Sequence, residues 1–554
     1  MPLKKFAKRT GMLALVVTAG LFAFKDPGDK YFAIAKNLDI FATLFKEVNT
    51  YYVDEVNPNK LMKTGIEAML KSLDPYTNYI PEDDIEDYRT MTTGQYGGIG
   101  SIIGTRNGNP MILMPYAGSP ADKSGLKIGD VIKSVDGIDV TDKGVEDISK
   151  LLKGQARTDL TINIQRYGED DERTIELTRE RITIDNVPYF GMVNDNIGYI
   201  RLANFTTGAG KEVENALEDL KKEGAEKIVF DLRGNPGGLL SEAVNVSNVF
   251  VDKGKEIVST KGKVTDWNKT YRALNGATDT EIPVAVLTSS RSASAAEIVS
   301  GVIQDYDRGI LVGNKTFGKG LVQATRPLTY NAQLKITTAK YYIPSGRCIQ
   351  AIDYSNRSED GSVGKIPDSL KVAFKTINNE RTVYDGGGID PDIEVEGKSL
   401  APITISLLTK NLIFDYATEY YYTREALKDP KNFTVSDTEY SKFVNWLSDK
   451  EYDYTTRVER NIDDLIKAAK NEKYYDAIDD RIEALRKKVQ HNKETDLQTF
   501  KAEIVEQLEE EIASRYFLQE GTIEASFDDD PVILEAVGVL EDTERYNGIL
   551  QGSI

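Results

Sequence analysis

Strands and helices alternate from about residue 195 to residue 313, and this alternation constrains the fold more than any other feature. Apolar runs typical of strands are "IGYIRLANF", "EKIVFDLRG", "IPVAVLTSS" and "RGILVGNKT". The segments between them have helical character: "AGKEVENALEDLKKEG", "LLSEAVNVSNVFV" and "ASAAEIVSGVIQDY". Such alternation predicts a layered α/β core with mostly parallel strands, which we place at residues 183–400.

Three further regions flank this core. Residues 92–182 contain short strands separated by glycine turns, with "GSPADKSGL" and "VEDISKLLKG" as short helices, and this pattern predicts a compact α+β module. Residues 26–91 carry apolar residues at helical spacing and predict an N-terminal helical region. Residues 401–554 are charged and helical in pattern, and they predict an appended C-terminal helical domain. The expected architecture is therefore multidomain, with both α/β and α+β parts.

The first 25 residues resemble an export signal in composition. A basic stretch, "MPLKKFAKRT", precedes the apolar run "GMLALVVTAGLFAF", which is shorter than a comfortable membrane span. We therefore expect residues 1–25 to be a signal peptide, or an N-terminal anchor if the signal is not cleaved. The expected location is the periplasm or cell envelope, with anchoring to the inner membrane as one form of it. A buried N-terminal helix is the alternative.

Composition excludes several classes of function. A net charge of −19 argues against nucleic acid as the partner, because phosphate binding requires a basic face. Cys348 is the single cysteine, so disulfide scaffolds and multi-cysteine metal sites are excluded. The single histidine, His491, lies in a polar helical segment, and this scarcity of ligands disfavours zinc hydrolysis.

The stretch "GNKTFGK" fits the G-x-x-x-x-G-K pattern of a nucleotide-binding loop. Such a loop requires Ser or Thr next, followed by a helix whose N-terminus faces the phosphates. Here the next residue is Gly320, and "LVQATRPL" predicts a strand. Nucleotide binding is therefore disfavoured, and Lys319 needs another explanation.

Lys319 has glycines on both sides and apolar neighbours at Phe317, Leu321 and Val322. A lysine in a dry pocket loses solvation of its charged form, so its pKa falls and it can act as a general base near neutral pH. The flanking glycines would let the backbone approach a substrate. A surface lysine in a glycine turn is the alternative.

A serine near the start of a predicted helix supplies the second half of this chemistry. Ser294 would lie at the helix N-terminus, where N–H groups and the helix dipole stabilise an oxyanion. An ordinary N-cap is the alternative, and Ser290 and Ser292 are rival candidates. The turn in "DLRGNPGG" would add backbone N–H donors from Gly237 and Gly238, although a plain β–α turn explains it too.

Lysine can replace histidine as the base in such a site. At these residues the chain resembles the C-terminal processing peptidases, also called tail-specific proteases. "SASAAEIVSGVIQD" followed by "TFGKGLVQ" is similar to that family's catalytic signature, and the family's serine-to-lysine separation of 25 residues (319 − 294 = 25) selects Ser294 and Lys319. The resemblance implies a Ser–Lys serine endopeptidase.

The resemblance implies further site residues. Gln323 would orient the lysine amine, and the N–H of Ala295 would complete an oxyanion hole with Gly237 or Gly238. Some descriptions of the family add an aspartate, which corresponds to Asp305. Eleven helical residues place Asp305 about 16 Å along the helix from Ser294, so a role in closing the helix is favoured.

The resemblance extends upstream to a PDZ domain, with "GSPADKSGLKIGDVIKSVDG" as its most specific part. The "GGIG" loop, Gly97, Gly98, Ile99 and Gly100, would then bind a chain-terminal carboxylate beside a strand edge. A hairpin turn is the alternative for these glycines. The chain departs from the family at Ser289 and Arg291, where Asn and Gly are common, and we expect this to affect substrate preference.

We therefore expect an exported serine endopeptidase that recognises substrate C-termini through a PDZ domain. Its expected partners are protein or peptide substrates with free apolar C-termini, and a second copy of the chain through the helical regions. No metal or cofactor is implied. The alternative is a catalytically silent PDZ adaptor on a protease scaffold, and the intact Ser294, Lys319 and Gln323 argue against it.

Overall fold

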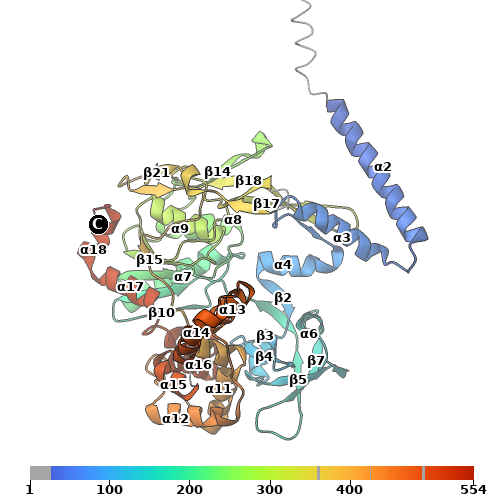
Figure 1. Cartoon of the computed structure of the whole chain (residues 1–554). Coiled ribbons are helices and arrows are strands. Elements are labelled where there is room, and N and C mark those ends of the chain that lie inside the picture. The colour runs from blue at the N-terminus through green and yellow to red at the C-terminus, as the bar shows by residue number, and fades with distance from the viewer. Residues whose placement is uncertain (1–26, 358–361, 425, 490–492, 554) are drawn as a thin grey trace, which may run out of the picture. The chain divides into compact units, whose positions relative to one another are not determined.

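The computed structural model describes residues 27–357, 362–424, 426–489 and 493–553. They divide into two units, Met1–Tyr79 and Ile80–Ile554. The described part of the first unit contains two helices, α2 (Pro27–Tyr51) and α3 (Pro58–Lys71) (Figure 1). The expected signal, residues 1–25, lies outside the described residues. Within the described ranges, no helix has the length and apolar character needed to cross a membrane.

The second unit is built around a six-stranded sheet in the order β10-β11-β12-β15-β16-β23. Strand β10 is antiparallel to β11, and each later pair of neighbours is parallel. The strands are β10 (Tyr189–Met192), β11 (Ile197–Arg201), β12 (Lys227–Asp231), β15 (Val284–Thr288), β16 (Ile310–Gly313) and β23 (Ile393–Glu394). The predicted α/β core with mostly parallel strands is confirmed.

Helices cover both faces of this sheet, which explains why its strands are apolar on both sides. Three helices pack in one large core cluster on one face: α7 (Ala209–Glu223), α8 (Leu240–Phe250) and α9 (Ala295–Asp305). The other face is covered by α17 (Pro531–Glu541), which comes from the C-terminal end of the chain and lies against β12, β15 and β16. The end of the chain thus completes the core of the α/β layer.

An antiparallel sheet lies beside the core and follows the lysine loop in sequence. Strand β18 pairs with β17 on one side and with β13 on the other, and β13 also pairs with β14. The bounds of these strands are β13 (Glu256–Gly262), β14 (Lys269–Arg272), β17 (Leu321–Pro327) and β18 (Gln333–Tyr342). Two small hairpins come next: β19 (Ile352–Arg357) with β20 (Val363–Lys365), and β21 (Ala373–Lys375) with β22 (Thr382–Tyr384).

The α+β module has its own sheet, in the order β3-β4-β5-β7-β8, and its own apolar core. Strand β2 pairs antiparallel with β9, so the two ends of the module lie side by side. Its elements are β2 (Gln95–Gly98), β3 (Ser101–Arg106), β4 (Asn109–Pro115), α5 (Pro120–Lys123), β5 (Val131–Val135), β6 (Ile138–Asp139), α6 (Val145–Leu152), β7 (Asp159–Gln165), β8 (Arg173–Thr178) and β9 (Glu180–Thr183). It is preceded by β1 (Asn78–Ile80) and α4 (Ile85–Thr93).

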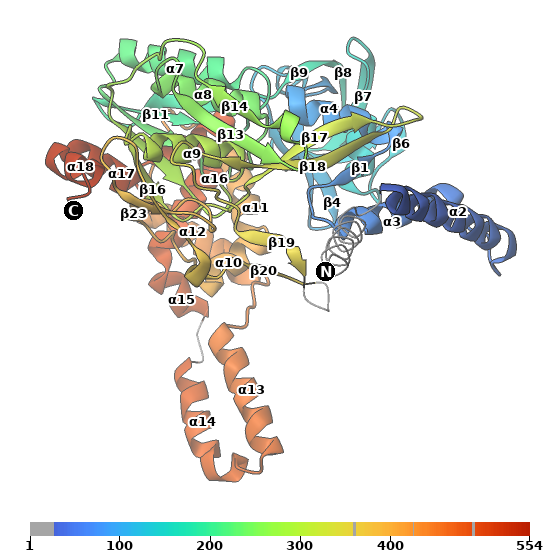
Figure 2. The same cartoon turned by 90° about the horizontal axis from the view of Figure 1, so that it is seen from above.

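The C-terminal part is helical, as predicted. Most of its helices share one core cluster, and α13 and α14 pack against each other as a hairpin (Figure 2). The helices are α10 (Pro402–Thr409), α11 (Leu412–Thr423), α12 (Asp437–Trp446), α13 (Arg457–Asn471), α14 (Tyr475–Val489), α15 (Lys493–Thr499), α16 (Lys501–Ala525), α17 and α18 (Thr543–Leu550). The multidomain architecture is thereby confirmed, with the addition that α17 belongs to the core of the α/β layer.

Candidate active site

Ser294 occupies a strained turn between β15 and α9. Its backbone has φ 56° and ψ −112°, a conformation that non-glycine residues rarely adopt. Such a conformation costs on the order of 1–3 kcal/mol, and it persists where surrounding contacts hold the residue in place. Ser294 is partly exposed, whereas the residues on either side of it, Ala293 and Ala295, are buried. The serine is therefore presented at the start of α9 and is accessible.

The rival serines are less suited to nucleophilic attack. The Ser292 side chain is fully buried, and its hydroxyl donates to Leu232 O at 2.8 Å. Ser290 is exposed on the turn, outside α9. The geometry therefore favours Ser294 among the three candidates.

A residue that we did not anticipate, Glu297, connects the serine turn to the lysine loop. Its Oε2 accepts the backbone N–H groups of Ser294 and Lys319, each at 2.9 Å. Its Oε1 accepts the Gly318 N–H at 2.7 Å and the Thr316 hydroxyl at 2.6 Å. One carboxylate thus fixes the backbones of Ser294 and Lys319 relative to each other.

The Glu297 side chain is fully buried, and burial raises its pKa to about 7. The four hydrogen bonds act in the opposite direction, because each of them favours the ionised form. A sequence signal for this residue exists: Glu297 follows Ser294 by three positions, the spacing at which a glutamate binds back to a helix N-terminus.

Two further contacts hold the same two segments together. The Phe317 N–H donates to Ser292 O at 3.0 Å, which joins the lysine loop directly to the serine turn. The Tyr341 hydroxyl, on β18, lies 3.2 Å from Ser294 O and 2.5 Å from Lys319 O. The structure therefore holds the backbones of Ser294 and Lys319 close together, and their pairing as nucleophile and base stays a prediction.

The glycines beside Lys319 meet a requirement that we did not anticipate. A β-carbon added at Gly318 would lie 2.4 Å from Ala351 Cβ, and one added at Gly320 would lie 2.8 Å from Gln350 N. These glycines allow close packing against the chain itself, whereas we had assigned them to substrate approach. Phe317 also differs from expectation, because it is 47% exposed and does not seal a dry pocket over the partly buried Lys319.

The other predicted side chains have other partners. The Gln323 amide donates to Thr337 Oγ1 at 3.2 Å across β17 and β18, and its role in orienting Lys319 stays a prediction. Asp305 is fully buried at the end of α9, where it forms an ion pair with Arg347 at 2.8 Å and accepts the Ser345 N–H. Asp305 thus joins the end of α9 to the segment that contains Ser345 and Arg347, in agreement with the expectation that it closes the helix.

The predicted oxyanion loop, residues 232–239, lies directly against the serine turn. A β-carbon added at Gly237 would come within 2.8 Å of both Ser294 Cβ and Ala295 N, so only glycine fits there. Asn235 O accepts the Ala293 N–H at 2.9 Å, which ties the loop to the residue before the nucleophile. In this structure the Gly237 N–H donates to Asn235 Oδ1 at 2.8 Å, so an oxyanion would have to compete with Asn235 for that donor.

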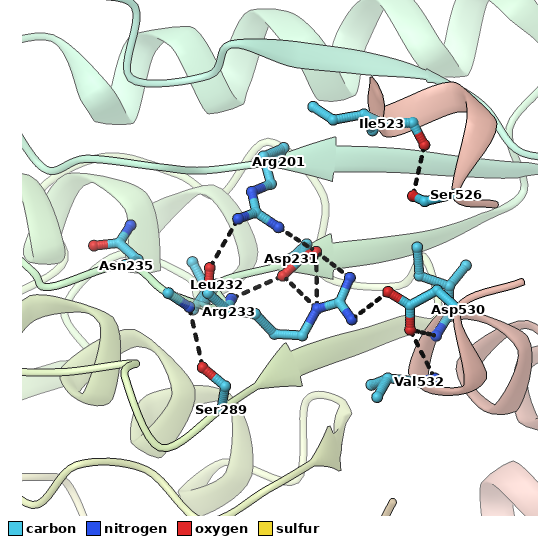
Figure 3. Close-up of polar contacts among 12 residues, drawn as sticks. Arg201, Asp231, Leu232, Arg233, Asn235, Ser289, Ile523, Ser526, Asp530 and Val532 are labelled. Atoms are coloured by element: carbon cyan, nitrogen blue, oxygen red, sulfur yellow. Dashed lines mark hydrogen bonds and ion pairs between the residues drawn. The ribbon is translucent and has the colours of Figure 1, made fainter. Parts of the chain in front are cut away.

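A buried charge cluster supports the start of this loop (Figure 3). Asp231, the last residue of β12, is fully buried and accepts hydrogen bonds from Tyr199 (2.6 Å), Arg201 (2.8 Å) and Arg233 (2.7 Å from Nη2). Burial alone would raise the pKa of Asp231, but the charges of Arg233 and Arg201 outweigh it and lower the pKa to about 2. Asp231 is therefore ionised throughout the neutral range. We did not predict this cluster, although the "DLR" motif belongs to the stretch that we used to predict the oxyanion loop.

The predicted carboxylate-binding residues lie at the end of β2 and in its connection to the edge strand β3. Gly97 and Gly98 belong to β2 and pair with β9, whereas Ile99 and Gly100 form the connection to β3. The carbonyl groups of Ile99 and Gly100 accept from Ala121 N (2.8 Å) and Tyr116 N (2.9 Å), which fixes the loop.

Comparison with known proteins decides the family. Residues 196–355 match the sequence profile of "Peptidase family S41", residues 112–166 match "PDZ domain", and residues 403–540 match "Probable PDZ-protease, C-terminal helical domain". The "Carboxy-terminal-processing protease" of Bartonella bacilliformis is 38% identical over 321 residues, which cover 57% of this chain and 73% of the relative. The chain belongs to peptidase family S41.

A second curated relative is consistent with this S41 assignment. The "Probable CtpA-like serine protease" of Staphylococcus aureus is 36% identical over 316 residues, which cover 56% of this chain and 62% of the relative. Among solved structures, a photosystem II D1 C-terminal processing protease is 27% identical, with 64% of this chain and 92% of that chain covered and a TM-score of 0.35. The chain is thus an S41 serine peptidase of the carboxy-terminal-processing type with a PDZ domain.

Proposed function

We propose that this S41 peptidase is exported, captures the free C-termini of proteins in its PDZ domain, and cleaves them with a Ser294–Lys319 dyad. In this mechanism Ser294 Oγ attacks the scissile carbonyl, and Lys319 takes the serine proton and later returns it to the leaving amine. Backbone N–H groups of Ala295 and of Gly237 or Gly238 receive the oxyanion. The observation that carries the proposal is the Glu297 carboxylate, which binds the backbones of Ser294 and Lys319 at once.

The PDZ part of the proposal rests on the edge strand and its neighbouring helix. Strand β3 ends the order β3-β4-β5-β7-β8, so its outer edge is available for pairing with an extended peptide. A hollow of about 40 Å³ beside it is lined by Tyr96, Ile99, Ser101, Ile103, Ser149, Leu152 and Lys153. This small volume suits a short aliphatic side chain at the peptide's end.

Carboxylate capture predicts a preference for free termini. We expect the Ser294→Ala enzyme to bind a peptide that ends in alanine or valine at least about tenfold more tightly than its C-terminal amide, because the amide lacks the charge that backbone N–H groups favour. Binding is measured by fluorescence anisotropy with labelled peptides. Ser149→Arg, which places a bulky side chain in the hollow, should weaken binding of the free peptide. Equal affinity for free and amidated peptides would rule out carboxylate capture.

A lysine base predicts cleavage that increases with pH, since Lys319 acts only after it has lost its proton. We expect kcat/KM for a short peptide to rise through an apparent pKa below the ~10.4 of free lysine. The profile of kcat/KM against pH should also rise near pH 7, where Glu297 ionises, because the ionised carboxylate binds its four hydrogen-bond donors more strongly. Glu297→Gln should remove this rise and keep the one that is due to Lys319. His491→Ala should leave the profile unchanged, and a profile that shifts in His491→Ala would show that the base is not Lys319.

Export rests on the basic and apolar segments of residues 1–25. We expect the full chain to appear in the cell-envelope or periplasmic fraction and a chain that starts at residue 26 to remain in the cytoplasm, as judged by immunoblotting of cell fractions. Equal distribution of the two chains would contradict export through this segment.

A further inference from the structure

The charge cluster behind the 232–239 loop is completed by a residue from the far end of the chain. Arg233 Nη1 donates to Asp530 Oδ2 at 2.6 Å, and the two residues are 297 positions apart (Figure 3). Without Asp530, two arginines, Arg201 and Arg233, would face the single carboxylate of Asp231. With Asp530 the cluster has two positive and two negative charges. The Arg233 and Asp530 side chains are only 18% and 21% exposed, so solvent screens this pair weakly.

Asp530 is itself fixed by the helix that it begins. Its Oδ1 caps α17 by accepting the N–H groups of Val532 (2.9 Å) and Ile533 (3.3 Å). The helix is anchored in turn by apolar packing against the sheet, in a cluster that joins Val532, Ile533, Ala536, Val539 and Leu540 to Val229, Ala285, Leu287, Ile310 and Val312. The carboxylate that meets Arg233 thus has a rigid support.

A continuous series of contacts leads from Asp530 to the nucleophile. Arg233 bonds Asp231 through its side chain and through its own N–H (2.7 Å), while Arg201 Nη2 donates to Arg233 O at 3.0 Å. Gly234, which follows Arg233, donates its N–H to Ser289 Oγ. Asn235 O accepts the N–H of Ala293, the residue before Ser294. These contacts connect the Arg233 side chain to the part of the loop that meets the serine turn.

We propose that Asp530 is a positioning residue for catalysis: through Arg233 it holds the 232–239 loop in register with Ser294. The C-terminal segment that contains α17 is accordingly part of the peptidase site, because it supplies a charge that the α/β core lacks. Displacement of catalytic groups by about 1 Å can lower a rate by roughly 10²-fold, so a mobile Arg233 is expected to affect turnover. Asp530 touches neither substrate nor reacting atoms in this account.

The test variant is Asp530→Asn in the full chain. Asparagine caps helices as well as aspartate does, so α17 keeps its N-cap while Arg233 loses its counter-charge. We expect kcat for a short peptide to fall at least about tenfold, with KM changed less than about threefold. The melting temperature should decrease, because Arg233 loses a weakly screened partner, but the enzyme should stay folded at the assay temperature. The matched control is Asp542→Asn, which makes the same change at the N-cap of α18, where Asp542 accepts the Arg545 N–H. The control should retain the kcat of the unmodified enzyme.

A double variant shows whether Asp530 acts through Arg233. If it does, the double variant with Arg233→Lys and Asp530→Asn should have about the same kcat as Arg233→Lys alone. Each change removes the same interaction, the bond between the Arg233 guanidinium and Asp530, so the second change has nothing further to remove. Multiplicative losses would overturn the proposal, as would an unchanged kcat in Asp530→Asn or an equal loss in Asp542→Asn. If Asp530→Asn does not fold, Asp530→Ser repeats the test with another good N-cap. Failure of both to fold would make Asp530 a residue of folding, against the proposal.

The inference rests on the proposed role of Ser294, and the two claims fail in different ways. Retained cleavage in Ser294→Ala would mean that the site itself is wrong, whatever Asp530 does. An inactive Ser294→Ala enzyme together with a fully active Asp530→Asn enzyme would remove only the positioning role.

Discussion

Replacing Ser294 or Lys319 by alanine is expected to reduce peptide cleavage by a factor of about 10⁴ or more, with the protein still folded. The serine supplies the attacking oxygen and the lysine accepts its proton, so loss of either one stops the same step. For that reason the double variant should be no worse than the single variants. Cleavage is followed with a quenched fluorescent peptide, and folding is checked by thermal melting.

Ser292→Ala is a useful comparison for this pair. It removes a neighbouring hydroxyl that is buried and bonded to Leu232 O, so it is expected to reduce stability and to lower cleavage far less than the loss of Ser294 or Lys319 does. Substantial turnover by Lys319→Ala would show that the enzyme does not use a Ser–Lys mechanism.

The second large effect is expected at Glu297. Each carboxylate oxygen of Glu297 accepts two hydrogen bonds. Glu297→Gln replaces one of these oxygens with an NH₂ group, which cannot accept, so two of the four donors lose their acceptor. Hydrogen bonds to a charged group contribute about 1.5–3 kcal/mol each, and the serine turn and lysine loop are then free to separate. We expect kcat to fall about 10²-fold and the melting temperature to decrease.

Glu509→Gln separates the loss of a buried carboxylate from the loss of this particular connection. Glu509 is also buried and accepts a backbone N–H, that of Val435, but it lies in the C-terminal helical cluster. Its replacement should lower stability and leave kcat of the folded enzyme unchanged. If Glu297→Gln retained full kcat, the connection between Ser294 and Lys319 would not matter for catalysis.

Local sequence patterns were sufficient for the elements that carry the chemistry. The apolar runs at Val284–Thr288 and Ile310–Gly313 became adjacent parallel strands, and the small-residue stretch after the first of them became α9. The sequence was also sufficient to disfavour a nucleotide-binding loop. It predicted a strand after Gly320, where a phosphate-binding loop requires a helix, and β17 begins there at Leu321. Strand and helix periods are local properties, and short windows report them.

Contacts between distant segments were not predictable in this way. The sequence did not indicate that α17 packs against β12, β15 and β16, or that Asp530 meets Arg233, because no local period encodes a pairing over 297 positions. The packing that requires glycine at Gly318 and Gly320 was likewise not predicted. A glycine shows that something approaches closely, but the approaching atoms, here those of Gln350 and Ala351, become known only from the fold.

Activation of Ser294 as a nucleophile by Lys319 can be measured by acylation of the active site. The enzyme is incubated with an electrophilic β-lactone that acylates serine hydroxyls, and the modified peptide is identified by mass spectrometry. A Ser–Lys dyad predicts a single modification, on Ser294, that appears in parallel with loss of activity and is slowed at least about 10²-fold in Lys319→Ala. Modification of Ser290 or Ser292 in place of Ser294, or equally rapid acylation of Ser294 in Lys319→Ala, would contradict it.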